Sequence, residues 1–168
     1  MSDAVVVTVL AACGCASIVI DVRTRRVPNV LTFGLAAAGL ALSALHLSGV
    51  GVWSALGGLA LGLVLMLPGH VIGATGAGDV KLMAAVGAVV GPDLALRAFL
   101  YSAVAGGVFA IVVATRRGVL ATTLQDTTRL VTAPAAARQT IESSGRANRF
   151  AYGPAIAVGT LFSVMVTL

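Results

Sequence analysis

The sequence predicts an all-α integral membrane protein with six transmembrane helices, and three observations lead to this prediction. Hydrophobic residues make up 58% of the 168 residues and charged residues only 10%, whereas a soluble domain needs about a quarter of its residues charged. The mean hydropathy is +1.02. Several apolar runs approach the ~20 residues that cross a bilayer as a helix. The composition therefore excludes a soluble globular domain.

The apolar runs predict one transmembrane domain over 1–168, with turn or charged residues bounding each run. The first run lacks the basic flank of a signal peptide and three arginines follow it, so it runs inward and stays in the membrane. Pro28 suits the first turn of the second helix, and Gly58 and Gly62 in the third allow close contact with another helix. Gly91-Pro92-Asp93 predicts an outer turn after the fourth. The expected spans are about 4–20, 30–47, 52–72, 78–91, 94–115 and 152–168, with a cytoplasmic loop over 116–149.

The basic residues support this topology. Of the 11 lysines and arginines, all except Arg97 fall on the predicted cytoplasmic side, which places both termini outside. The net charge of +5 therefore reflects cytoplasmic loops and not a nucleic-acid partner. The arginine-rich loop over 116–149 is expected to form an amphipathic helix on the anionic leaflet or, over 144–148, a disordered segment.

Residues that commonly bind metals are few and scattered. Cys13 and Cys15 lie two apart in an apolar run, so on a helix their side chains point in different directions, and the sequence has no second pair to complete a zinc site. His46 and His70 are single. We expect no metal and no cofactor.

Two aspartates are expected to share one membrane depth. The glycine-rich stretch 73–81 carries Asp79 at the predicted cytoplasmic start of the fourth span, and Asp21 ends the first span on the same side. The segment from Asp79 to Val90 is too short to span alone. Either the glycine-rich stretch dips into the membrane or the protein is thin there, and both options put Asp79 below the surface. An acid in that setting is a functional candidate, because burying its charge is costly.

Each aspartate also has a structural interpretation. Asp79 can cap the fourth helix, and Asp21 can pair with the arginines that follow it, although a helix C-terminus disfavours a carboxylate. Their shared depth favours a carboxylate pair that shares one proton. In such a pair the ionised acid takes a proton from water while the neutral acid polarises a carbonyl, which is the chemistry of aspartic peptide hydrolysis. Gly76 and Gly78 leave room for an extended peptide backbone beside Asp79.

The residues around these acids carry a family resemblance. Gly76-Ala77-Gly78-Asp79-Val80-Lys81-Leu82 resembles the GxGD motif of intramembrane aspartic proteases. With Asp21 before Val27-Pro28-Asn29, and Tyr152-Gly153-Pro154-Ala155 opening the last span, nearly the whole chain resembles the type IV prepilin peptidases. The short form is similar to those of tight-adherence (Flp-type) pilus systems and to archaeal preflagellin peptidases.

The resemblance implies a GxGD aspartic protease architecture with Asp21 and Asp79 as the catalytic residues. It implies cleavage of type IV prepilins or pseudopilins, after a glycine that precedes the hydrophobic pilin helix, in pilus assembly or protein secretion. The site would face the cytoplasm from the inner membrane. Larger members carry an N-terminal region with paired CxxC motifs and methylate the new pilin N-terminus. This chain has neither the region nor those cysteines, so we expect a peptidase without N-methyltransferase activity.

Gly76, Gly78 and Lys81 are the candidate substrate-binding residues. Lys81 lies two residues past Asp79, off its helix face, and either snorkels to the cytoplasmic surface, favours ionisation of the acid pair, or holds an acidic substrate residue. The arginine-rich loop either sets the membrane topology through its positive charge or binds the leader peptide of the substrate. Because prepilin leaders are themselves usually basic, the topological role is favoured. The expected partners are a prepilin and membrane lipids.

Two other functions are compatible with parts of the sequence. A small proton- or ion-coupled transporter also uses paired membrane acids, but these acids are expected near one face and no inverted repeat is visible. An inactive assembly factor of a pilus or secretion machine leaves the acid pair unexplained.

Overall fold

The structure is a computed structural model that describes residues 7–8, 10–12, 14, 28–71, 75–116, 118 and 153–167. All regular secondary structure in this part of the chain is α-helical, which confirms the all-α prediction. Most of the first predicted span and nearly all of the predicted loop over 116–149 lie outside the described residues. The helices are α2 (Asn29–Ala44), α3 (Val52–Val71), α4 (Ala77–Arg116) and α7 (Gly153–Thr167), and residues 7–14 include further helical positions.

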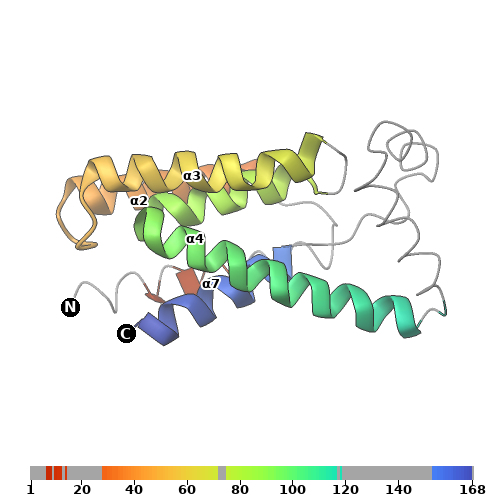
Figure 1. Cartoon of the computed structure of the whole chain (residues 1–168). Coiled ribbons are helices and arrows are strands. Elements are labelled where there is room, and N and C mark those ends of the chain that lie inside the picture. The colour runs from red at the N-terminus through yellow and green to blue at the C-terminus, as the bar shows by residue number, and fades with distance from the viewer. Residues whose placement is uncertain are drawn as a thin grey trace.

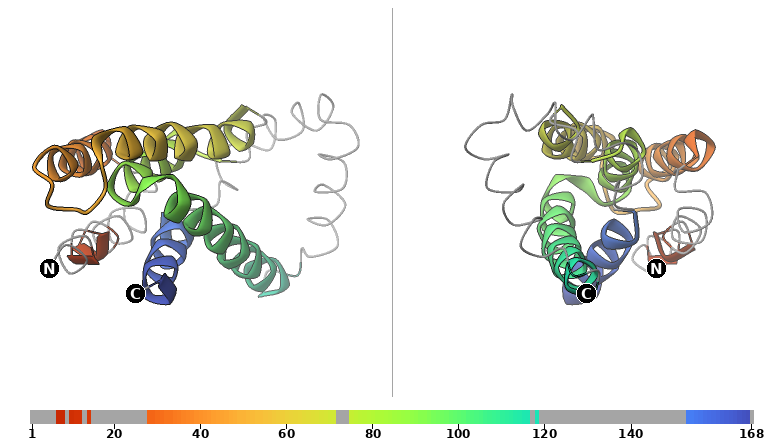
Figure 2. Two further views of the ribbon diagram at one scale, coloured as in Figure 1. Left: turned by 60° about the vertical axis from the view of Figure 1, so that its left-hand side comes forward. Right: turned by 90° about the vertical axis from the view of Figure 1, so that its right-hand side faces the viewer.

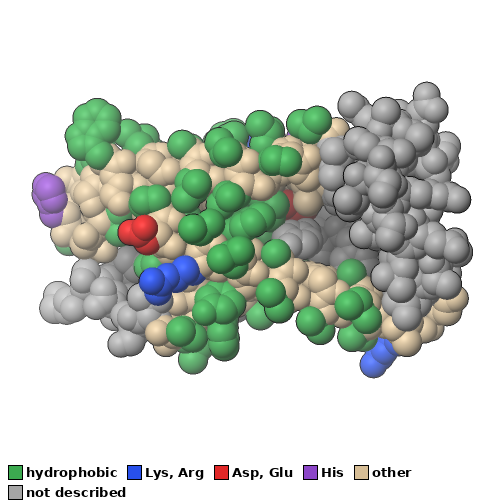
Figure 3. Space-filling model, in the orientation of Figure 1, with side chains coloured by type: hydrophobic (Ala, Val, Ile, Leu, Met, Phe, Trp, Pro, Cys, Tyr) green, Lys and Arg blue, Asp and Glu red, His purple; other side chains and the backbone are tan. Residues whose placement is uncertain are grey.

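Two of these helices are long and apolar enough to cross a membrane, over Val52–Val71 and Ala77–Val113, while α2 and α7 are apolar but shorter. Large apolar side chains are exposed on all four helices, and Figure 3 shows them spread over the visible face of the molecule. A surface of this kind suits lipid better than water. The count of six transmembrane helices stays a prediction. Examples of such exposed side chains, one from each helix, are Val30, Trp53, Val104 and Met165.

A sharp bend divides α4 into two halves at the predicted turn. Gly91 has φ 78° and ψ 176°, and Pro92 follows it. A positive φ is readily adopted by glycine, and the proline ring leaves no N–H to continue the helical hydrogen bonding. The chain therefore reverses its course here, so that the second half runs back toward the level at which α4 began (Figures 1 and 2).

The first half of α4 is the central element of the described fold. Except for the half-buried Lys81, every residue from Asp79 to Gly91 is buried. α2, α3 and α7 all pack against α4, and Leu10 joins the same core. Helices on several sides of this short segment exclude water from it. The core centres on Met83 and Val89 of α4 and Ile156 of α7, none of which is exposed.

Glycines let α3 approach this central segment until the two backbones touch. A Cβ atom at Gly62 would lie 2.5 Å from the carbonyl oxygen of Met83, and one at Gly58 would overlap the carbonyl group of Gly87. The prediction that Gly58 and Gly62 permit close helix contact is therefore confirmed. In α2, Gly39 serves the same purpose, since a Cβ there would lie 2.9 Å from the carbonyl oxygen of Ala88.

Candidate functional site

The turn between α3 and α4 is fastened to the end of α3. The Thr75 N–H donates to the carbonyl oxygen of Gly69 at 3.1 Å, and Nδ1 of His70 lies 3.2 Å from the carbonyl oxygen of Thr75. The Thr75 side chain also packs on Gly69, where a Cβ would come within 3.1 Å of its hydroxyl oxygen. These contacts set the position from which α4 begins.

Asp79 lies in the first turn of α4, with 6% of its surface exposed. The Gly76 N–H donates to Asp79 Oδ2 at 3.2 Å, and the Asp79 N–H donates to the Gly76 carbonyl oxygen at 3.1 Å. Gly76 therefore occupies the N-cap position and Asp79 the third helical position. The interpretation of Asp79 as the N-cap residue is wrong, because the cap lies three residues earlier. Its carboxylate reaches back to the cap, as an acidic side chain does in a capping box.

This contact makes Gly76 part of the carboxylate's surroundings. A Cβ at Gly76 would lie 3.2 Å from Asp79 Oδ2, which is tighter than ordinary contact. Gly78 is half-buried in the same turn. The structure thus brings Asp79, Gly76 and Gly78 together at one helix N-terminus, where the helix dipole also favours a carboxylate.

Asp21, the other predicted catalytic residue, lies outside the described residues, as do the three arginines that follow it and Gly73. The nearest described residues are Gly14 on one side and Pro28 on the other. Pro28 precedes α2 and accepts hydrogen bonds from the backbone N–H groups of Leu31 and Thr32, at 3.1 and 3.4 Å.

Lys81 points to the beginning of α2. Its Nζ donates to Asn29 Oδ1 at 2.9 Å and lies 5.5 Å from the ring centroid of Phe33. No role for Asn29 or Phe33 was predicted from the sequence. A signal was available, because the start of the second predicted span and Lys81 share the predicted cytoplasmic depth.

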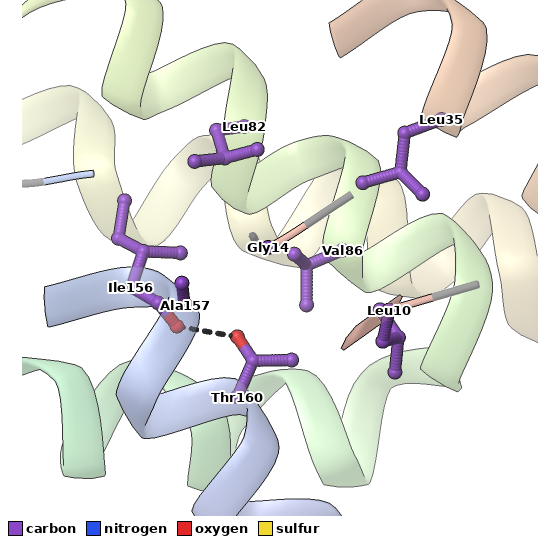
Figure 4. A pocket seen from close by; sticks show the side chains of 8 residues that line it. All are labelled: Leu10, Gly14, Leu35, Leu82, Val86, Ile156, Ala157 and Thr160. Carbon is purple, nitrogen blue, oxygen red and sulfur yellow. Dashed lines mark hydrogen bonds between the residues drawn. The ribbon is translucent and has the colours of Figure 1, made fainter. Parts of the chain in front are cut away.

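A small apolar cavity lies next to the central segment, between the N-terminal residues, α2, α4 and α7 (Figure 4). Its one polar side chain, Thr160, donates its hydroxyl to the carbonyl oxygen of Ile156 at 2.7 Å. The cavity shows that Leu10 and Gly14 face the same part of α4 as α7 does. Its lining residues are Leu10, Gly14, Leu35, Leu82, Val86, Ile156, Ala157 and Thr160.

Within the described residues, no group of three or more His, Cys, Asp or Glu side chains is placed to hold a metal ion.

The family comparison covers the segment that contains both aspartates. A family model for type IV leader peptidases matches residues 8–111, well over half of the chain. No curated protein and no solved structure matches the chain significantly. The match together with the apolar helices indicates a membrane peptidase with a protein substrate. The chain belongs to the type IV leader peptidase family.

Proposed function

We propose that this protein is a membrane-embedded aspartic endopeptidase that removes the leader peptide of type IV prepilins or pseudopilins. It would act on the cytoplasmic side of the inner membrane, without N-methyltransferase activity. The observation that carries the proposal is the buried Asp79 carboxylate, held by the Gly76 N–H at the N-terminus of the central helix. It lies within the segment that matches the leader peptidase family.

Asp21 is proposed as the second catalytic acid, and the register of the described residues supports the pairing. Gly14 and Val86 line one cavity, and the direction from Leu10 to Gly14 there is opposite to the direction from Leu82 to Val86 (Figure 4). Asp21 follows Gly14 by seven residues, and Asp79 precedes Val86 by seven. Seven helical residues make about two turns, or ~10 Å. A helix continuing to Asp21 would thus reach the depth of Asp79.

The proposed chemistry follows from two carboxylates that share one proton. The ionised acid accepts a proton from a water molecule, and that water attacks the carbonyl carbon of the peptide bond. The neutral acid donates its proton toward the carbonyl oxygen as the tetrahedral intermediate forms. The intermediate then collapses and the C–N bond breaks. The acid that took the proton from water gives it to the leaving amine, and the other acid takes back the proton of the former carbonyl oxygen. The low exposure of Asp79 itself limits the screening of its charge by bulk water.

The glycines are proposed to leave room for the substrate backbone, so Gly78→Val is expected to lower the cleavage rate about tenfold or more. The branched side chain would stand in the first turn of α4 beside Asp79, where a misplacement of about 1 Å is costly. The measurement is the initial rate of leader removal in membranes. Gly107→Val is the matched control, because no atom lies within 4 Å of a Cβ at that helical glycine. Equal rates for the two variants would argue that Gly78 does not border the substrate.

Co-expression with a reporter prepilin tests the function itself. The reporter carries a basic leader, a glycine at the junction and a hydrophobic helix. We expect a shortened pilin whose new N-terminus begins after the glycine and carries no methyl group, as read by mass spectrometry. A full-length reporter beside abundant enzyme would contradict the proposed function, and a methylated product would contradict the absence of methyltransferase activity.

A further inference from the structure

We infer that Lys81 is a positioning residue of the peptidase site, which ties the first turn of α4 to the beginning of α2. The inference rests on the proposed function. Asp79 precedes Lys81 by two residues, and Asn29, its hydrogen-bond partner, follows Asp21 by eight. The contact therefore joins the two chain segments that carry the proposed catalytic acids.

The ammonium group of Lys81 makes two contacts to one short stretch of α2. It donates to Asn29 Oδ1 at 2.9 Å and lies 5.5 Å from the Phe33 ring centroid. Asn29 and Phe33 are four residues apart, so they lie one turn apart on the same face of the helix. A cation over an aromatic face is attracted by the ring's quadrupole. Both contacts connect the beginning of α2 to the first turn of α4.

The two partners differ in how firmly the rest of the fold holds them. Beyond Lys81, the buried residues 82–91 fix α4 between its neighbours. The beginning of α2 contacts the described fold on one face only, where Thr32 is buried, whereas Val30 is 85% and Phe33 61% exposed. Lys81 thus reaches from a fixed helix to a less supported helix end. Loss of this contact is expected to loosen the segment that leads back to Asp21 more than the turn that holds Asp79.

A positioning role and direct substrate binding, the other role open to Lys81, predict different kinetic effects of substitution. A lysine that held substrate would act without Asn29, and its loss would raise KM. A lysine that acts through Asn29 and Phe33 lowers kcat when either partner is lost, because a small error in the relative position of two catalytic groups slows the chemical step.

The test is a double-mutant cycle on the full-length protein in liposomes, with the reporter prepilin as substrate. Lys81→Met keeps the aliphatic stem and removes the cation, and Asn29→Ala removes the acceptor. We expect each variant to lower kcat by about tenfold with little change in KM, since a hydrogen bond to a charged group contributes on that order. The double variant should be no slower than the slower single variant, because both changes break one contact. Asn29→Asp keeps the acceptor and should keep most of the wild-type kcat.

Several outcomes would overturn the inference. Additive losses in the double variant, or a loss in Asn29→Asp equal to that in Asn29→Ala, would show that the contact does not act through Asn29. A raised KM in Lys81→Met alone would assign Lys81 to the substrate. Arg97→Met, which removes an exposed cation from the second half of α4, is the charge-matched control and should leave both constants unchanged. No cleavage by the wild type would overturn the proposed function and this inference with it, whereas cleavage with additive losses overturns the inference alone.

Discussion

Gly58→Ala in α3 is expected to destabilise the protein by about 1–3 kcal/mol or more, whereas Gly57→Ala, one residue earlier, is expected to be tolerated. A Cβ at Gly58 would overlap the carbonyl group of Gly87 and approach the carbonyl carbon of Gly91 to 2.8 Å. These are backbone atoms of the buried central segment, so no side chain can rotate away. A Cβ at Gly57 meets no atom within 4 Å.

Thermal unfolding of the two variants in the same detergent measures the difference. The pair is closely matched, because both substitutions replace a helical glycine by alanine and gain the same helix propensity. Gly87→Ala should repeat the effect from the other side, since a Cβ there would overlap the carbonyl group of Gly58. Equal unfolding temperatures for Gly57→Ala and Gly58→Ala would show that α3 and α4 do not pack as closely as this structure has them.

The contact between α3 and α4 shows how far the sequence predicts the fold. A spacing of four between Gly58 and Gly62 is enough to identify a face that permits close approach. The spacing does not identify the partner, because many apolar stretches of this chain could meet such a face. Only the structure identifies Met83 and Gly87 as the residues that the two glycines contact.

The sequence predicted which helix ends lie at the same level, but it did not predict how each helix is rotated about its axis. Counting spans predicts that the beginning of the fourth span and the beginning of the second lie at one level, and the hydrogen bond from Lys81 to Asn29 shows that the beginnings of α4 and α2 are neighbours. Hydropathy says nothing of how a helix is turned about its axis. The contact of Lys81 with Asn29, 52 residues away in sequence, and the bond from the Gly76 N–H to Asp79 depend on that rotation and on local backbone geometry.

The sharp bend in α4 was the most local prediction. Gly91 and Pro92 act through their own backbone constraints, positive φ for one and a missing N–H for the other, so their effect needs no distant partner. Features of this kind can be predicted from neighbouring residues alone. Contacts between helices cannot, since they require the relative placement of surfaces that are all apolar.

Asp79→Asn and Asp21→Asn are each expected to abolish detectable leader cleavage, while the protein still accumulates in the membrane. Asparagine has the shape of aspartate but cannot take a proton from water, and removal of a general acid or base typically costs about 10²–10⁴-fold in rate. The fold should survive at position 79, because an amide oxygen can still accept the Gly76 N–H. The measurement is conversion of the reporter prepilin at equal enzyme levels in membranes.

Asp93→Asn is the matched control, since Asp93 is an exposed acid on the same helix, just beyond the bend. It should cleave as the wild type does. Full cleavage by Asp79→Asn would overturn the aspartic mechanism altogether. Full cleavage by Asp21→Asn with an inactive Asp79→Asn would leave Asp79 as a single essential acid and would require another proton donor. Loss of activity in both variants, with normal cleavage by Asp93→Asn, is the result that two cooperating carboxylates demand.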